Sequence, residues 1–340
     1  MHTADTRAAA ALACEVVEDL QEIDALAAEW DALLERTPCN RAFSSHAWYA
    51  AACRVNPSLK PHLITARRGP SLAALFPLAV DAAAHEAVFP SAMSNYNDIV
   101  AEADDSEAAT ALLRHALTHP RAYGRLSLWW IRKSSNAARA ARLLFEAGEA
   151  EEAFGVAREY AYLRLPGSYE EFLKGRSRAF RKALLRAQRK AAADGLRVRE
   201  LTPEEFPPSE LPEMFLRLHL ARFGERSCFE KQANLTFARL ALPPLFARRQ
   251  MRVFALLRGE EVVGIDLSMN GASSLCTWNG GFLPEFEQWS PGRLVIDAGV
   301  RRACELGLGE YDLLRGAYDW KMTWADSVRE VGRLEFTLRG

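Results

Sequence analysis

The sequence of 340 residues is poor in the features that mark secreted, zinc-binding or membrane-spanning proteins. Its six cysteines are widely spaced, with no C-x-x-C pair and no nearby histidine pattern of the kind that binds zinc. No apolar run approaches the ~18 residues needed to span a bilayer. The alanine-rich start before Cys14 is too short for an export signal. We therefore expect a cytoplasmic protein with reduced thiols, no metal site and no membrane span.

An excess of charge of one sign is also missing, because 43 Lys and Arg residues face 44 Asp and Glu residues, a formal net charge of −1. The chain as a whole therefore has no electrostatic attraction to nucleic acid or anionic lipid. Apolar residues make up 49% of the sequence, which is ample for packed cores. Since the length exceeds that of one average domain, we expect two domains.

The two halves of the sequence share a pattern of strand, glycine turn and strand. The first copy is centred on Arg68-Gly69 and the second on Arg258-Gly259. Each copy is followed by a helical stretch, a glycine and a further apolar run, and the same order of elements predicts an internal duplication of an α/β unit. Between the two copies, Pro166-Gly167 ends the strand-like run from Tyr160 to Leu165. The predicted domains are residues 1–165 and 166–340.

Comparing the copies indicates which domain carries chemistry. When they are aligned, Phe76 falls opposite Asp266 and Ser127 falls opposite Asp312, so the titratable groups occur only in the second copy. This predicts a structural first domain and a catalytic second domain. One polar run of the first domain, Ser94 to Asp98, leaves two interpretations open. Either Asn97 lines a groove shared with the second domain, or the run is a turn whose side chains bond the backbone.

A helix start in the second half has the character of an anion site. Ser290 stands at the N-cap position, Pro291 at the first helical position, and Gly292 and Arg293 follow. The unpaired N–H groups and partial positive charge of such a start, reinforced by Arg293, favour a phosphate, pyrophosphate or carboxylate. Good capping alone explains the same residues, and that alternative stays open.

Two aspartates are candidate bases. Asp266 interrupts an apolar alternating strand, where an acid is costly unless it is paired or functional, and burial would raise its pKa. Asp312 ends a strand near Arg315 and Lys321, so its alternative is a salt bridge to one of them.

Further candidates come from the surrounding polar and aromatic residues. His219 lies on a helix beside apolar neighbours, and is either a packed core residue or a contact to substrate. Trp278 and Asn279 precede two glycines and form either a plain hairpin turn or a wall of the acceptor site. Tyr318 and Trp320 belong to the turn that carries Lys321.

A strongly basic helix is predicted over 172–193. Eight Lys and Arg residues fill its polar faces without an intervening acid, although like charges at i,i+4 destabilise a helix. Their partners are either acids of the same chain, such as Glu170, Glu171, Glu204 and Glu210, or an anionic ligand. Candidate ligands are the CoA 3′-phosphate, tRNA, an anionic lipid or a polysaccharide.

The late segment resembles a known family. Ser290-Pro291-Gly292, Gly307, Asp312, Gly316, Lys321 and Trp324 are similar to the C-terminal part of the CelD/BcsL-type acetyltransferases, the FemAB-like branch of the GNAT superfamily. Trp320 stands where the family usually has Tyr, and Tyr318 where it usually has an acidic residue. The resemblance implies an α/β fold of two tandem GNAT-like domains with mixed central sheets. It also implies acetyl-CoA or another acyl-CoA as the donor.

The resemblance further implies an amine acceptor, such as an amino sugar in cell-envelope or exopolysaccharide metabolism. We accordingly expect Ser290, Pro291, Gly292 and Arg293 to bind the donor. The expected catalytic residues are Asp266, Asp312, Lys321 and His219. The expected acceptor contacts are Trp278, Asn279, Arg315, Tyr318, Trp320 and Asn97.

Two rival functions remain. One keeps the fold and takes aminoacyl-tRNA as the donor, as the Fem-type ligases do, although the balanced net charge makes nucleic acid the less favoured partner. The other is a degenerate, non-catalytic GNAT-like binding protein, for which Tyr318 at the usually acidic position is the argument.

Overall fold

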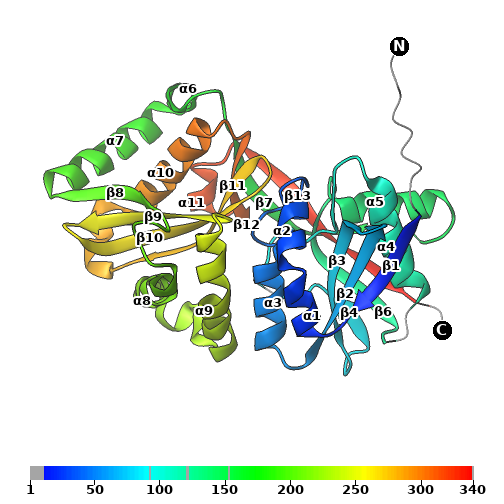
Figure 1. Cartoon of the computed structure of the whole chain (residues 1–340). Helices are drawn as coiled ribbons and strands as arrows, with labels where there is room; N and C mark the ends of the chain where they lie inside the picture. The colour runs from blue at the N-terminus through cyan, green and yellow to red at the C-terminus, as the bar shows by residue number, and fades with distance from the viewer. Residues whose placement is uncertain (1–10, 92, 120–121, 152–153, 339–340) are drawn as a thin grey trace, which may run out of the picture. The chain divides into compact units, whose positions relative to one another are not determined.

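The computed structural model describes residues 11–91, 93–119, 122–151 and 154–338 (Figure 1). The chain divides into two compact units. Unit 1 holds the described residues of Met1–Cys39, Pro57–Gly155 and Gly332–Gly340, and unit 2 holds Asn40–Asn56 and Val156–Val331. Each unit therefore contains a short segment that lies far along the sequence from the rest of it.

Unit 1 is an α/β unit with a mixed sheet. Its strands lie in the order β1, β2, β3, β4, β6, in which β4 and β6 are parallel and the other neighbours antiparallel, and β5 pairs with β3. The elements of unit 1 are β1 (Leu12–Val17), α1 (Leu20–Ala25), α2 (Ala27–Leu34), β2 (Leu59–Arg68), β3 (Ser71–Asp81), β4 (Glu86–Val88), β5 (Val100–Ala101), α4 (Ser106–Thr118), β6 (Arg125–Arg132) and α5 (Asn136–Glu146).

The core of unit 1 forms where α4 and α5 cover the sheet. Leu112 and Leu113 of α4 and Leu144 of α5 pack against Phe76 and Leu128 of the strands, all essentially inaccessible to solvent. β13 (Ser327–Thr337) begins in unit 2, and its second half adds Leu334 and Phe336 to this core.

Unit 2 is also α/β with a mixed sheet. Its strands lie in the order β7, β12, β11, β10, β9, β8, in which β11 and β12 are parallel and the other neighbours antiparallel. The elements are α3 (His46–Val55), β7 (Phe154–Arg164), α6 (Tyr169–Lys174), α7 (Arg178–Ala193), β8 (Leu196–Leu201), α8 (Leu211–Phe223), α9 (Gln232–Ala247), β9 (Met251–Arg258), β10 (Glu261–Asn270), β11 (Ser274–Phe282), α10 (Pro291–Glu305), β12 (Glu310–Arg315) and α11 (Asp319–Met322). Four 3₁₀ turns, η1 (Pro208–Glu210), η2 (Gly224–Arg226), η3 (Cys228–Glu230) and η4 (Pro284–Trp289), complete it.

Helices cover both faces of the unit 2 sheet, with α7 and α10 on one side and α8 and α9 on the other (Figure 1). On the first side, Phe180 and Leu184 of α7 and Val300 of α10 share one apolar core. On the second side, Trp48 of α3 packs edge-on against Phe237 of α9, with ring centroids 4.8 Å apart. Because both faces are buried, the strands read as nearly continuous apolar runs.

The predicted duplication is visible in matching backbone irregularities. Ala73 of β3 has no pairing partner on β2, and Val263, at the equivalent place of β10, has none on β9. These are β-bulges, which insert one extra residue in a strand. Trp130 of β6 and Leu314 of β12 both have a positive φ, 64° and 59°. The expected α/β architecture with mixed sheets is confirmed.

The positive φ values correct one detail of the alignment. Matching Trp130 to Leu314 places Leu128, rather than Ser127, opposite Asp312. The pairing of Phe76 with Asp266 is kept, because it lies at the same offset as the two bulges. The conclusion drawn from the alignment is unchanged, since each of the two acids of unit 2 is still aligned with an apolar residue of unit 1.

Two other expectations differ from the structure. The helix predicted over 172–193 is interrupted, because Ser177 caps α7 by accepting from Phe180 N at 3.1 Å, so α6 and α7 are separate helices. The predicted cut at residue 165 falls just after β7, whereas the compact units separate at Gly155 and exchange the segments that carry α3 and the end of β13. Among the residues that the structure describes, no helix combines the length and apolar character that crossing a bilayer requires.

Candidate active site

A cavity of about 680 Å³ opens in unit 2 between β11, β12, α10 and α11. Six of the residues predicted for donor and acceptor binding line it: Gly292 and Arg293 of α10, Trp278 and Asn279 of β11, Tyr318 just before α11, and Trp320 of α11. The predicted catalytic residues Asp266 and Lys321 also line it. Most of the site predicted from the sequence is therefore gathered at one place.

The cavity exists because two parallel strands part. β11 and β12 pair only from Ser274 to Cys276 and from Glu310 to Asp312. Beyond that point β12 turns away, as Leu314 takes its left-handed conformation and its N–H donates to Asp312 Oδ1 at 2.7 Å. The register with β7 shifts at the same residues. Asp312 thus builds the bulge that opens the cavity, and it is not itself among the lining residues.

Asp266 is the buried acid of the cavity. Its side chain belongs to a residue only 4% exposed, and its oxygens accept from the hydroxyls of Ser268, at 2.6 Å, and Thr277. Burial raises the pKa of the carboxyl to about 6, and the two hydroxyl donors oppose that rise. A carboxyl with this pKa is ionised at neutral pH and close to the range in which a general base works best.

Residues Trp278 to Gly281 belong to strand β11. The turn expected there from the sequence is therefore wrong, whether it was taken as a plain hairpin or as a wall of the acceptor site. A side chain at Gly281 would meet the backbone of α8, since its Cβ would lie 2.5 Å from His219 Cα. The missing side chain lets helix and strand approach closely enough for His219 Nδ1 and Gly280 O to lie 2.9 Å apart in a hydrogen bond.

His219 backs the cavity without lining it. Its ring packs against Phe223, at a centroid distance of 4.6 Å, and against Phe229 at 5.0 Å. Burial lowers the pKa of the imidazole, and the bond to Gly280 O opposes that shift. The structure therefore places His219 as a neutral packed residue, the first of the two alternatives left by the sequence.

The start of α10 differs from the sequence expectation in one respect. Ser290 occupies the N-cap position with a left-handed backbone, φ 55° and ψ 55°, and its side chain makes no capping hydrogen bond. Its carbonyl instead accepts from Arg293 N, at 3.0 Å, and Leu294 N. Capping by the Ser290 hydroxyl is thus wrong. Since Pro291 has no N–H, the first amide of the helix is that of Gly292, a residue that lines the cavity.

Lys321 is buried although it is a cation. Its ammonium donates to Leu314 O at 3.3 Å and to Arg315 O at 2.5 Å, both at the bulge of β12. Burial lowers its pKa to about 8, Asp312 opposes that shift, and Arg315 adds to it. Tyr318 and Trp320 flank it, with Nζ 5.6 Å from each ring centroid, and both rings are at least half exposed.

Six predicted site residues lie apart from the cavity lining, two of them being Ser290 and Pro291 at the start of α10. Arg315 follows the bulge, and Asp312 forms an ion pair with Arg329 at 3.7 Å. Asn97 lies in unit 1, where its amide donates to Trp129 O of β6 at 2.9 Å, a bond to a distant strand that the turn interpretation did not predict. His219 is the sixth.

Sequence reasoning missed Thr277, Arg222 and Phe282, which also line the cavity. Thr277 is the partner of Asp266, and Arg222 lies over the Phe282 ring with its guanidinium carbon 4.5 Å from the centroid. The only signal for Thr277 was the alternation of polar residues in neighbouring strands. Its position opposite Ser268 follows from strand register, which sequence spacing does not determine.

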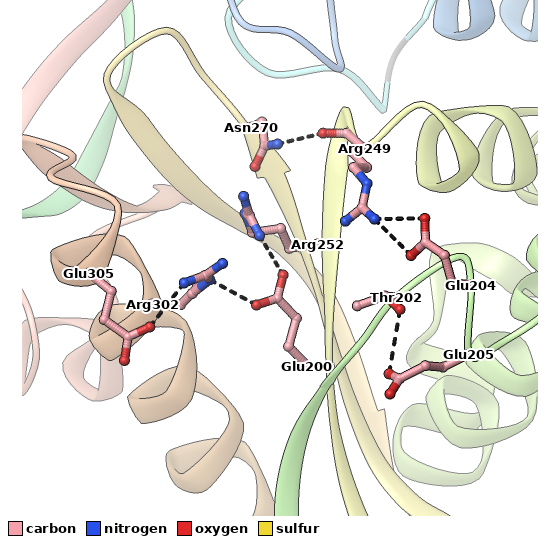
Figure 2. A network of polar contacts seen from close by, with 9 residues as sticks. All are labelled: Glu200, Thr202, Glu204, Glu205, Arg249, Arg252, Asn270, Arg302 and Glu305. Carbon is pink, nitrogen blue, oxygen red and sulfur yellow. Dashed lines mark hydrogen bonds and ion pairs between the residues drawn. The ribbon is translucent and has the colours of Figure 1, made fainter.

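A polar network fixes the far end of α10 (Figure 2). Glu200 of β8 accepts from Arg252 of β9 and forms an ion pair with Arg302 of α10 at 3.0 Å. The neighbouring pair of Glu204 and Arg249 is far more exposed. The helix whose start borders the cavity is thus tied to the sheet at its other end.

Comparison with known proteins identifies the domain. Residues 178–322 match the family model described as "Acetyltransferase (GNAT) domain". The fold is similar to that of "FemX", with a TM-score of 0.63 and 13% identity over 96% of this chain and 97% of that chain. It is also similar to L-PGS from Bacillus licheniformis, with a TM-score of 0.60 and 11% identity over 95% and 93% of the two chains.

A search of curated proteins gave no match. Within the described ranges, no three His, Cys, Asp or Glu side chains gather in a way that could hold a metal ion. The cavity between the parted strands lies inside the matched segment, and its lining runs from Arg222 to Trp324. The chain thus carries a GNAT acetyltransferase domain match over residues 178–322, within an α/β fold of two GNAT-like units with mixed sheets.

Proposed function

We propose that the protein is an acyl-CoA-dependent N-acyltransferase that transfers an acyl group, taken here as acetyl, to an amine. The observation that carries the proposal is the start of α10. It has no side-chain cap and no acidic residue in its first turn, and it borders a cavity that contains a buried carboxylate. A helix start that the protein leaves without an anion favours an anionic ligand.

The donor lies with its pyrophosphate at Gly292 and Arg293 and with its thioester between the parted strands. The pantetheine arm is a polar amide chain, and the separation of β11 from β12 leaves a strand edge along which such a chain extends. The thioester carbon then lies in the cavity near Asp266 and Lys321.

In the transfer, the acceptor nitrogen attacks the thioester carbonyl carbon, a C–N bond forms and the C–S bond breaks. Asp266 takes the proton that the nitrogen loses, because its carboxylate is ionised at pH 7 and returns a proton readily with a pKa of about 6. The CoA leaves as a thiolate. Lys321, as an ammonium with a pKa of about 8, stabilises that negative charge and supplies its proton.

The acceptor site is lined by aromatic rings. Trp278, Phe282, Tyr318 and Trp320 line the cavity, and rings of this kind stack against the apolar face of a sugar. Together with the resemblance to CelD/BcsL-type enzymes, this supports an amino sugar of cell-envelope or exopolysaccharide metabolism as the acceptor, with the reaction in the cytoplasm. Tyr318, at the usually acidic position of that family, serves the acceptor rather than the proton transfer.

Isothermal titration of the full chain with CoA and acetyl-CoA tests the proposal. We expect saturable binding of both at micromolar concentration, and weakening by Arg293→Ala. Release of free thiol from acetyl-CoA, followed across a panel of amino sugars, then identifies the acceptor. An absence of binding to both cofactor forms would move the donor to aminoacyl-tRNA, the rival favoured by the charge of α7.

A further inference from the structure

A second hollow, of about 500 Å³, runs along α7 beside the start of α10. Its charged lining is entirely cationic: Lys182, Arg186 and Lys190 of α7 and Arg293 of α10. Gln288 and Ser290 are its polar neutral residues. We call this hollow the α7 groove. Its three α7 cations are spaced four residues apart, so they share one helix face and span about 12 Å along the helix axis.

The cations of the α7 groove are not neutralised by acids of the described chain. Glu204 pairs with Arg249, and Glu287, the nearest acid of η4, lies 3.4 Å from Arg222. Asp194, which ends α7, accepts from Trp289 Nε1 at 2.6 Å. Over residues 154–338, no ion pair involves Lys182 or Arg186, and Lys190 donates to the backbone and side chain of Gln288. The alternative of pairing with acids of the same chain thus holds for Arg176, which forms an ion pair with Asp326 at 3.1 Å, but not for Lys182 or Arg186.

The arrangement is unfavourable for the protein alone. Lys182 and Arg186, and Arg186 and Lys190, are like charges at i,i+4, each costing a few tenths of a kcal/mol in a helix. α7 nevertheless places them on one face toward α10. An anion bound between the two helices removes this repulsion and forms charge-assisted hydrogen bonds with several donors at once.

The α7 groove adjoins the active-site cavity at Arg293. Arg293 lines both hollows, and Ser290, whose hydroxyl is not used in capping, lies between α7 and the first turn of α10. A donor whose pyrophosphate lies at Gly292 and Arg293 therefore has its nucleotide end directed along α7.

We infer that the α7 groove is a phosphate subsite that takes the 3′-phosphate of the CoA donor, and that it makes the protein select CoA over donors that lack this group. The inference rests on the proposed acyl-CoA function and names the part of the donor that α7 recognises. A phosphate monoester fits better than an uncharged adenosine, because the groove offers cations and no carboxylate.

The test compares CoA with 3′-dephospho-CoA, which keeps the pyrophosphate and the pantetheine arm. Titration calorimetry of the full-length protein at low salt is expected to show CoA binding roughly tenfold to a hundredfold more tightly, the range of a charged contact. This ratio should shrink as salt is raised, since the groove is open to solvent.

The double variant Lys182→Ala/Arg186→Ala removes the centre of the groove. We expect it to lose most of the preference for CoA while dephospho-CoA binds as before. The matched control is Arg178→Ala/Arg189→Ala, which removes the same charge from exposed positions of α7 outside the groove. The control should keep the preference, and circular dichroism should show native helix content in both variants.

Each outcome decides the inference. A wild-type protein that binds the two cofactors equally would overturn the phosphate subsite and leave the acyl-CoA function standing. So would a preference that survives in Lys182→Ala/Arg186→Ala, or one lost equally in the control. If the wild-type protein binds neither cofactor, and tRNA binding is lost with the same double variant, both the subsite and the acyl-CoA function are overturned.

Discussion

The starts of two equivalent helices, α4 in unit 1 and α10 in unit 2, are built in opposite ways. Asp105 caps α4 by accepting from Ala108 N at 3.1 Å, and Glu107 follows in the first turn. Arg68 binds both carboxylates and holds the pKa of Asp105 below its usual range. The first turn of α10 has no acid and no side-chain cap. Unit 1 therefore supplies its own anion at a helix start, and unit 2 supplies none at the place where we propose that the donor binds.

The two units also use a buried aspartate differently. Burial raises the pKa of Asp98 in unit 1 and of Asp266 in unit 2 to about 6 in each case. Asp98 accepts from the backbone N–H groups of Asn136 and Ala137 and so closes the start of α5. Asp266 accepts only from hydroxyls and borders a cavity. The same burial thus accompanies a structural cap in one unit and, in the other, a carboxylate at a cavity that we propose as the base.

The largest expected effect comes from exchanging each of these acids for its amide. Asp266→Asn should lower kcat about 10²- to 10⁴-fold, the usual contribution of a general base, with little change in Tm. Asp98→Asn should lower Tm and leave the kcat of the folded protein unchanged. In the wild-type protein, kcat/KM should rise with pH through about 6, because the base acts as the carboxylate. Equal kinetic losses in both variants would erase the distinction between the units.

The second prediction concerns a carboxylate introduced into the first turn of α10, where α4 already has Glu107. Gly292→Asp adds a carboxylate in the first turn, where a Cβ meets no atom within 4 Å. CoA binding should weaken roughly tenfold to a hundredfold by charge repulsion and loss of the open site, while the helix gains about 0.3 to 1 kcal/mol. Gly292→Ala is the control, and calorimetry with CoA should show it near wild type. Unchanged affinity in Gly292→Asp would place the donor elsewhere.

The third prediction concerns the buried cation of unit 2. Burial lowers the pKa of Lys321 to about 8, below its value in the unfolded chain, so the unfolded state binds more protons between pH 8 and 10. The free energy of unfolding should rise with pH in this window, and Lys321→Met should remove on the order of 2 kcal/mol of that rise. Urea titrations at several pH values measure it. The same change at the exposed Lys133 of unit 1 should leave the pH dependence as it is.

The smallest expected effect concerns the ion pairs that hold one end of each helix, the start of α4 and the last turn of α10. α4 is tied at its start by Arg68, and α10 at its last turn by Arg302 and Glu200. Glu200→Gln should cost about 1 to 2 kcal/mol of stability, because it weakens the partly buried ion pairs of this carboxylate with Arg252 and Arg302. Glu204→Gln breaks only an exposed pair with Arg249 and should cost less than about 1 kcal/mol. Denaturant midpoints of the two variants, if indistinguishable, would show that the network does not anchor α10.

Much of the fold and part of the site could be predicted from the sequence. Gly69 and Gly259 mark their turns, and apolar runs mark the buried strands, because local backbone conformation and burial leave direct traces in residue type. The placing of Gly292 and Lys321 in one site followed from the family resemblance, whereas Trp278 was proposed from its position before two glycines. Thr277 beside Asp266, Arg329 beside Asp312 and the left-handed Ser290 depend on strand register and on packing between distant segments. Such relations have no signature in sequence spacing.

The exchange of short segments between the two units has a consequence for how such a chain evolves. Residues Asn40–Asn56 come before most of unit 1 but complete the core of unit 2, where Trp48 packs, and the chain returns to unit 1 after Gly332. No single crossover point in the gene separates the halves without leaving one core unfilled. A crossover between the halves would therefore have to carry the exchanged segment along with the unit whose core it fills.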